Sequence, residues 1–93
     1  MKETTVQKKI LDYLKKNGIS CFKTVATNRN GVSDIIGLTK QGRFFAIEVK
    51  VPAKKANTSK LQDIYIAEVK ASGGIAGVAT SVEEAKEILN VQD

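Results

Sequence analysis

Apolar residues recur at helical spacing near the N-terminus, with lysines between them: Val6, Ile10, Tyr13 and Leu14. This pattern predicts an amphipathic helix over residues 4–17. Thr4 and Gln7 stand at capping-box spacing, so we expect them to cap its first turn. Asn17-Gly18 then supplies residues that accept the backbone conformation of a helix end.

Three segments of the first half predict strands. Residues 19–26 form the first, around Ile19, Cys21, Phe22 and Val25. Residues 34–38 and 43–51 are apolar runs on either side of the turn at 39–42. Because a glycine lies in that turn, we expect the two runs to pair as a β-hairpin.

The second half predicts a helix over 59–72, a strand over 75–79 and a helix from Ser81 to about Asn90. Pro52 ends the preceding strand, and a basic loop follows over 53–58. Ser59 and Gln62 again stand at capping-box spacing. The order αβββαβα, without repeats or linkers, predicts one α/β domain over residues 1–93. Its mixed β-sheet would be flanked by helices.

The residue types present in the chain exclude several kinds of catalytic and metal site. The chain of 93 residues has no histidine and one cysteine, Cys21. A histidine-based triad, an imidazole base and a histidine-ligated zinc site are therefore excluded, as is an intrachain disulfide. We expect Cys21 to be a buried or half-buried core thiol. Catalysis, if present, would use carboxylates, lysines, hydroxyls or a hard metal ion.

The net charge of +5 favours an anionic partner, with nucleic acid ahead of a membrane surface. The alternative is a surface that is simply rich in lysine. The longest apolar runs are too short to cross a bilayer, and residues 1–5 lack the apolar segment of a signal peptide. These features predict an intracellular, cytoplasmic protein without a membrane partner.

Three charged residues lie on the predicted hairpin. Asp34 begins its first strand, and Glu48 and Lys50 lie near the end of its second. The two-residue period places Glu48 and Lys50 on one face of the strand, and the hairpin places Asp34 opposite them. Two carboxylates can hold Mg²⁺ or Mn²⁺, and a nearby lysine can orient water or stabilise charge during phosphodiester hydrolysis. Alternatively, all three are solvated surface residues.

Asp34 followed by Glu48-Val49-Lys50 resembles the signature of the PD-(D/E)xK nuclease superfamily. The longer motifs resemble the stand-alone viral form of the VRR-NUC domain: Gly31-Val32-Ser33-Asp34-Ile35-Ile36-Gly37, Phe45-Ala46-Ile47-Glu48-Val49-Lys50 and Leu61-Gln62. The resemblance implies a restriction-endonuclease-like fold, similar to archaeal Holliday junction resolvases. It also implies a Mg²⁺- or Mn²⁺-dependent endonuclease acting on DNA, often on branched or junction structures, and a homodimer.

By this likeness, Asp34, Glu48 and the Val49 carbonyl would be metal ligands and Lys50 the catalytic lysine. Ser33 stands where the family often has proline, which removes a rigid turn but no ligand. The family also often carries a glutamate near the metal on its first helix, which corresponds here to Glu3. The alternative for Glu3 is a favourable carboxylate at a helix N-terminus.

Gln62 shares a helical face with Ile66 and Val69, so we expect it to point inward. A buried amide needs a partner, and a group at the active centre would supply one. Its alternative role is the capping box with Ser59.

Candidate DNA contacts are Lys54, Lys55, Lys60 and Arg29, with Lys23 close by; each could equally be a solvated surface residue. No element suited to reading bases is evident, which favours recognition of DNA structure. Two symmetric cuts in a junction need two active sites, which favours a dimer. The competing interpretations are a non-catalytic nucleic-acid-binding module of the same fold and a domain that binds an acidic protein.

Overall fold

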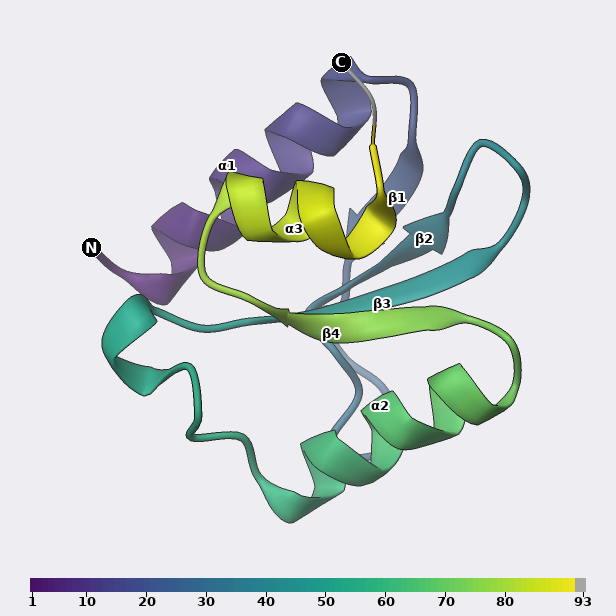
Figure 1. The fold of residues 1–93 in the computed structure, drawn as a ribbon. Coiled ribbons are helices and arrows are strands. Elements are labelled where there is room, and N and C mark those ends of the chain that lie inside the picture. Colours follow the sequence, from purple (N-terminus) through teal and green to yellow (C-terminus); the bar gives the residue numbers. More distant parts are fainter. Residues whose placement is uncertain (92–93) are drawn as a thin grey trace.

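A computed structural model describes residues 1–91 and has the expected order αβββαβα (Figure 1). Its elements are α1 (Glu3–Lys16), β1 (Ser20–Lys23), β2 (Ile35–Leu38), β3 (Phe44–Val49), the short 3-10 helix η1 (Pro52–Lys54), α2 (Lys60–Ala71), β4 (Ile75–Ala79) and α3 (Val82–Leu89).

The four strands form one mixed sheet in the order β1-β2-β3-β4. The first three are antiparallel, and Ile35 of β2 pairs with Ile47 of β3. Strand β4 runs parallel to β3, so the chain must cross over between them, and α2 lies in this crossover. The prediction of an α/β fold with a mixed sheet is confirmed.

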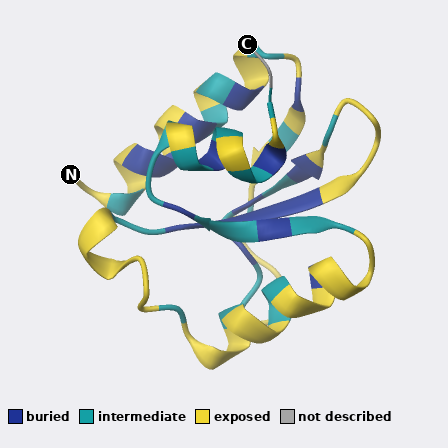
Figure 2. Cartoon of the chain, in the orientation of Figure 1, coloured by how far each residue is buried: buried dark blue, intermediate teal, exposed yellow. Residues whose placement is uncertain are grey.

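Helices cover both faces of the sheet, with α1 and α3 on one side and α2 on the other (Figure 1). The larger core lies under α1 and α3 and includes Ile10, Leu14, Ile35, Phe45 and Ile47. A smaller cluster of Ala46, Val69 and Ala76 lies under α2. Strand β3 is consequently buried on both faces (Figure 2). Any polar side chain near its end is held in a protein interior.

Two local predictions were wrong. Helix α1 begins at Glu3, its N-cap is Lys2, and no side chain caps it, so Thr4 and Gln7 form no capping box. Because the helix starts earlier, Thr4 lies inside the first turn and Gln7 is buried in the next. Strand β1 also ends at Lys23 rather than at 26, because its pairing with β2 stops at Ile35.

Other local predictions are confirmed. Ser59 is the N-cap of α2 and forms a capping box with Gln62, and Ser81 caps α3. Cys21 is half-buried beside the larger core, and burial raises the pKa of its thiol. Within residues 1–91, none of the helices combines the length and hydrophobicity needed to cross a bilayer.

Candidate active site

The β2–β3 hairpin brings Asp34 to the carboxyl end of β3. Asp34 directly precedes β2, and the pairing of Ile35 with Ile47 places it beside Glu48 and Val49. Its Oδ2 accepts a hydrogen bond from the Val49 backbone N–H at 2.7 Å. On the other side, the Thr24 backbone N–H donates to the Asp34 carbonyl at 2.8 Å. Asp34 is therefore held through both its side chain and its backbone.

Glu48 is a buried carboxylate, with 2% of its surface exposed. The Gln62 Nε2 donates a hydrogen bond to its Oε2 at 3.1 Å, and the Lys50 Nζ lies 4.0 Å from the same oxygen. Lys50 is itself largely enclosed, with 15% of its side chain exposed. Glu48 and Lys50 are therefore not solvated residues on an open sheet face.

Burial raises the pKa of Glu48 to about 8, and the neighbouring carboxyl group of Asp34 acts in the same direction. The Lys50 ammonium lowers this pKa, and Glu3 on α1 raises it slightly. Two carboxyl groups that share a buried site disfavour each other's ionisation. A cation between them would remove that cost, which is the electrostatic property of a carboxylate metal site.

Gln62 performs both roles that its position suggested. Its Oε1 accepts a hydrogen bond from the Ser59 backbone N–H at 2.9 Å, which completes the capping box of α2. Its Nε2 reaches Glu48 on the neighbouring strand. The helix cap therefore fixes the amide that contacts β3.

Gly31 allows the loop before Asp34 to approach α2 closely. Its φ is +88°, and a Cβ at this position would lie 2.6 Å from the Leu61 backbone. Only glycine fits both this conformation and this contact. The contact brings the loop that carries Asp34 against the residue that precedes Gln62.

The oxygen atoms around Glu48 fit a hard divalent cation in part. The Glu48 Oε1 is buried and has no hydrogen-bond partner in the part of the chain described, so it is a carboxylate oxygen free to bind a ligand. The Ser33 Oγ, next to Asp34, is likewise buried and unpartnered among these residues. However, no group of three acidic or cysteine side chains within residues 1–91 is arranged to hold a metal. The charge of Glu3 raises the pKa of Glu48, but Glu3 does not complete a three-residue metal site among the described residues.

Comparison with known proteins identifies the family. The sequence model of the VRR-NUC domain matches residues 2–83. The chain belongs to the VRR-NUC family. A solved structure described as "VRR_NUC domain" superposes with a TM-score of 0.74, covering 98% of this chain and 97% of that chain at 22% identity. At this identity the likeness supports the fold alone. No curated protein matched the chain.

VRR-NUC is a nuclease-type domain, which implies a DNA substrate, and the family typically uses divalent metals. The basic residues of this VRR-NUC domain differ in how available they are for such a substrate. Lys54 and Lys60 are exposed in the segment that follows β3. Lys55 instead donates to Glu84 Oε2 at 2.6 Å. Arg29 pairs with Glu68 at 2.8 Å and lies over the Tyr65 ring.

Glu84 was not among the residues singled out from the sequence. Its Oε1 accepts hydrogen bonds from the Thr80 backbone N–H and hydroxyl at 2.7 and 2.6 Å, and Lys55 occupies its other oxygen. These contacts lower the pKa of Glu84 to about 2. Glu84 therefore ties the loop after β3 to the start of α3. The capping spacing from Ser81 to Glu84 was the available signal, but it did not indicate Lys55.

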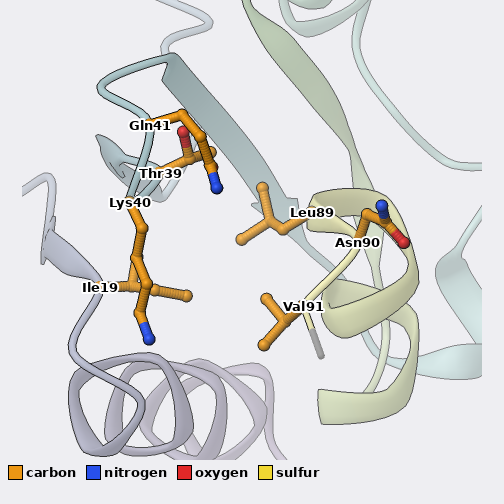
Figure 3. A pocket seen from close by; sticks show the side chains of 7 residues that line it. All are labelled: Ile19, Thr39, Lys40, Gln41, Leu89, Asn90 and Val91. Carbon is orange, nitrogen blue, oxygen red and sulfur yellow. The ribbon is translucent and has the colours of Figure 1, made fainter. Parts of the chain in front are cut away.

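The VRR-NUC domain also has a hollow of about 220 Å³ between the β2–β3 turn and the end of α3 (Figure 3). Its wall includes Ile19, Lys40, Leu89 and Val91, and none of the lining residues within 1–91 carries a carboxylate. It lies at the end of β3 opposite Glu48 and Val49. The hollow is therefore separate from the carboxylate site.

Proposed function

We propose that this chain is a divalent-metal-dependent endonuclease that hydrolyses DNA phosphodiester bonds. The observation that carries the proposal is the environment of Glu48, a buried carboxylate beside Asp34. One of its oxygens is held by Gln62, and the other has no hydrogen-bond partner among residues 1–91. A domain that only binds nucleic acid gains nothing from such a pair, because carboxylates repel phosphate unless a cation lies between them.

In this proposal Asp34, Glu48 and the Val49 carbonyl would hold Mg²⁺ or Mn²⁺, with Glu3 as a further candidate ligand. A bound divalent ion supplies an acidified water and neutralises charge at the phosphate. Lys50, which is largely enclosed beside Glu48, orients the attacking water or stabilises developing charge. Gln62 holds the Glu48 carboxylate in one orientation.

We further propose that branched DNA, such as a Holliday junction, is the preferred substrate and that the active form is a homodimer. Lys54 and Lys60, exposed at the two ends of the loop after the site, would contact phosphates. Phosphate contacts carry no sequence information, so recognition through them would depend on the shape of the DNA. Symmetric cutting of a junction requires two active sites, and one chain supplies one.

The test is cleavage of labelled four-way junction, duplex and single-stranded DNA in Mg²⁺, in Mn²⁺ and in EDTA. We expect cleavage only with a divalent metal, and most with the junction. Glu48→Gln should abolish it, and Glu83→Gln, an exposed glutamate on α3, serves as the matched control. A domain that binds DNA but cleaves no substrate in either metal would instead be a non-catalytic binding module.

A further inference from the structure

A polar hollow of about 340 Å³ lies in the loop that joins β1 to β2. Its lining extends along this loop from Thr24 to Val32, and within residues 1–91 no other segment contributes to it. We call it the loop hollow. Neither the carboxylates of the proposed metal centre nor the lysines proposed to contact DNA line it, so the proposed function leaves it without a role.

The loop hollow adjoins Asp34 at both of its ends. The Thr24 backbone N–H donates to the Asp34 carbonyl at 2.8 Å, and the Thr24 hydroxyl donates to the Ser33 carbonyl at 2.8 Å. At the other end, Ser33 alone separates Val32 from Asp34. A ligand in the hollow would therefore lie next to the carboxylate that is proposed to bind the metal.

The backbone of this loop presents hydrogen-bond donors. The N–H groups of residues 25–32 donate none of the backbone hydrogen bonds found outside the helices and strands of residues 1–91. The Thr27 hydroxyl donates to the Arg29 carbonyl at 2.6 Å, which bends the loop, and Gly31 follows with a φ of +88°. Successive N–H groups in a turn form a concave site that favours an anion.

The charges around the loop hollow also favour an anion. None of residues 13–33 is Asp or Glu, whereas this stretch includes Lys23 and Arg29. Glu68 on α2 pairs with Arg29 and offsets its charge. Lys23, however, is exposed at the end of β1 and belongs to none of the ion pairs found among residues 1–91. Lys23 and the N–H dipoles therefore supply the excess positive charge.

The lining of the hollow suits a sugar–phosphate backbone better than a base. Among the described residues, no aromatic side chain lines it, so a base would lack a stacking partner there. The exposed Asn30 amide and the backbone N–H groups are neutral donors of the kind that position DNA phosphates. Val25 is 88% exposed and lines the same hollow, where it can contact the apolar edge of a deoxyribose.

We propose that the loop hollow binds a phosphate of the DNA strand next to the phosphate that is cut. The inference rests on the proposed function in one respect, because the metal centre at Asp34 defines which phosphate is cut. Lys54 and Lys60 belong to a different segment, which follows β3. The DNA would therefore be held by two separate segments of the chain, one before Asp34 and one after Glu48.

The first test is fluorescence anisotropy with labelled DNA in Ca²⁺, so that binding is measured without cleavage. Asn30→Asp and Val25→Asp each place a carboxylate in the loop hollow, and each should raise the DNA Kd at least about tenfold. Gln41→Glu is the matched control, because it adds the same charge on the exposed turn at the other end of β2. Its Kd should stay within about twofold of the wild-type value.

The second test locates the contact by NMR, for which a chain of 10.1 kDa is well suited. In a titration of the labelled wild type with a short DNA duplex in Ca²⁺, the amide signals of residues 25–32 should shift. The signals of residues 39–42, at the other end of β2, should not. A parallel titration with poly-glutamate tests whether the same amides respond to an acidic protein instead.

Wild-type DNA affinity in both variants, with folding verified by circular dichroism, would overturn the inference. So would amide signals of residues 25–32 that respond to poly-glutamate but not to DNA. Because neither measurement uses cleavage, a chain that binds DNA in the loop hollow and cuts none would refute the proposed nuclease alone. A chain that cuts DNA while both variants bind it as the wild type does would refute the role of the hollow alone.

Discussion

The Gln62 side chain joins the cap of α2 to strand β3. Its Oε1 accepts from the Ser59 backbone N–H at 2.9 Å, and its Nε2 donates to Glu48 Oε2 at 3.1 Å. Because both ends of the amide are engaged, the side chain has one orientation. The start of α2 and the end of β3 are therefore coupled through a single residue.

The two roles of Gln62 can be separated by substitution. Gln62→Glu keeps an oxygen for the helix cap but loses the donor to Glu48, so we expect cleavage to fall at least about tenfold. Ser59→Ala removes the cap and should lower stability by about 1 kcal/mol. It should leave cleavage nearly unchanged below the melting range. Thermal melts and single-turnover rates would show this; an equal loss of cleavage in both variants would assign Gln62 to capping alone.

The pKa of Glu48, about 8 against an ordinary 4.5, makes the metal-free fold sensitive to pH. A raised carboxyl pKa contributes stability that is complete below pH 4.5 and is lost as pH rises through 8. In EDTA, we therefore expect the wild-type Tm to fall relative to that of Glu48→Gln between about pH 5 and pH 9. Mg²⁺ should raise the Tm of the wild type but not of Glu48→Gln.

Glu83→Gln is the control for this comparison, because Glu83 is exposed on the first turn of α3. Its Tm should follow that of the wild type at every pH. Parallel pH profiles for the wild type and Glu48→Gln would show that the Glu48 charge is not buried as described.

The sequence was sufficient to predict the element order and the meeting of Asp34 with Glu48, because a hairpin with a short turn has few possible registers. The sequence alone could not show that Gln62 both caps α2 and contacts Glu48, because either role by itself would explain a glutamine at this position. The pairings of Lys55 with Glu84 and of Arg29 with Glu68 join residues far apart in the chain. Such contacts depend on tertiary packing and leave no periodic signal. The prediction that Thr4 caps α1 was wrong because the apolar periodicity does not fix the first residue of the helix, which has Lys2 as its N-cap.

The lowered pKa of Glu84 makes stability depend on pH in the opposite direction to Glu48. Its pKa is lowered to about 2 by Lys55 and Thr80, so its contribution is present above pH 4.5 and is lost as pH falls through 2. We expect Glu84→Gln to lose about 1 kcal/mol at pH 7, because the amide still accepts from Thr80 but lacks the charge that pairs with Lys55 and strengthens these bonds. Urea titrations would measure this, with the exposed Glu87→Gln as control. A loss that persists unchanged near pH 2 would rule out the charge as its cause.

Lys54 and Lys60 should contribute to DNA affinity through phosphate contacts. Replacing either with alanine should weaken binding equally for all sequences and reduce the slope of log K against log salt by about 0.9. Fluorescence anisotropy in Ca²⁺ at several salt concentrations would measure the slope. Lys16→Ala, at the far end of α1, is the control. Unchanged slopes for both variants would place the DNA on another surface.

Asp34 and Glu48 are proposed to form a metal centre that cleaves DNA, and single-turnover cleavage by Asp34→Asn tests this proposal most directly. Asp34 and asparagine have the same shape, so the variant should fold and bind DNA; Asp12→Asn on the exposed side of α1 is purified alongside as control. We expect the wild type and Asp12→Asn to cleave a labelled four-way junction in Mg²⁺, and Asp34→Asn to be at least about a thousandfold slower. Cleavage by Asp34→Asn at the wild-type rate, or by all three proteins in EDTA, would contradict the account.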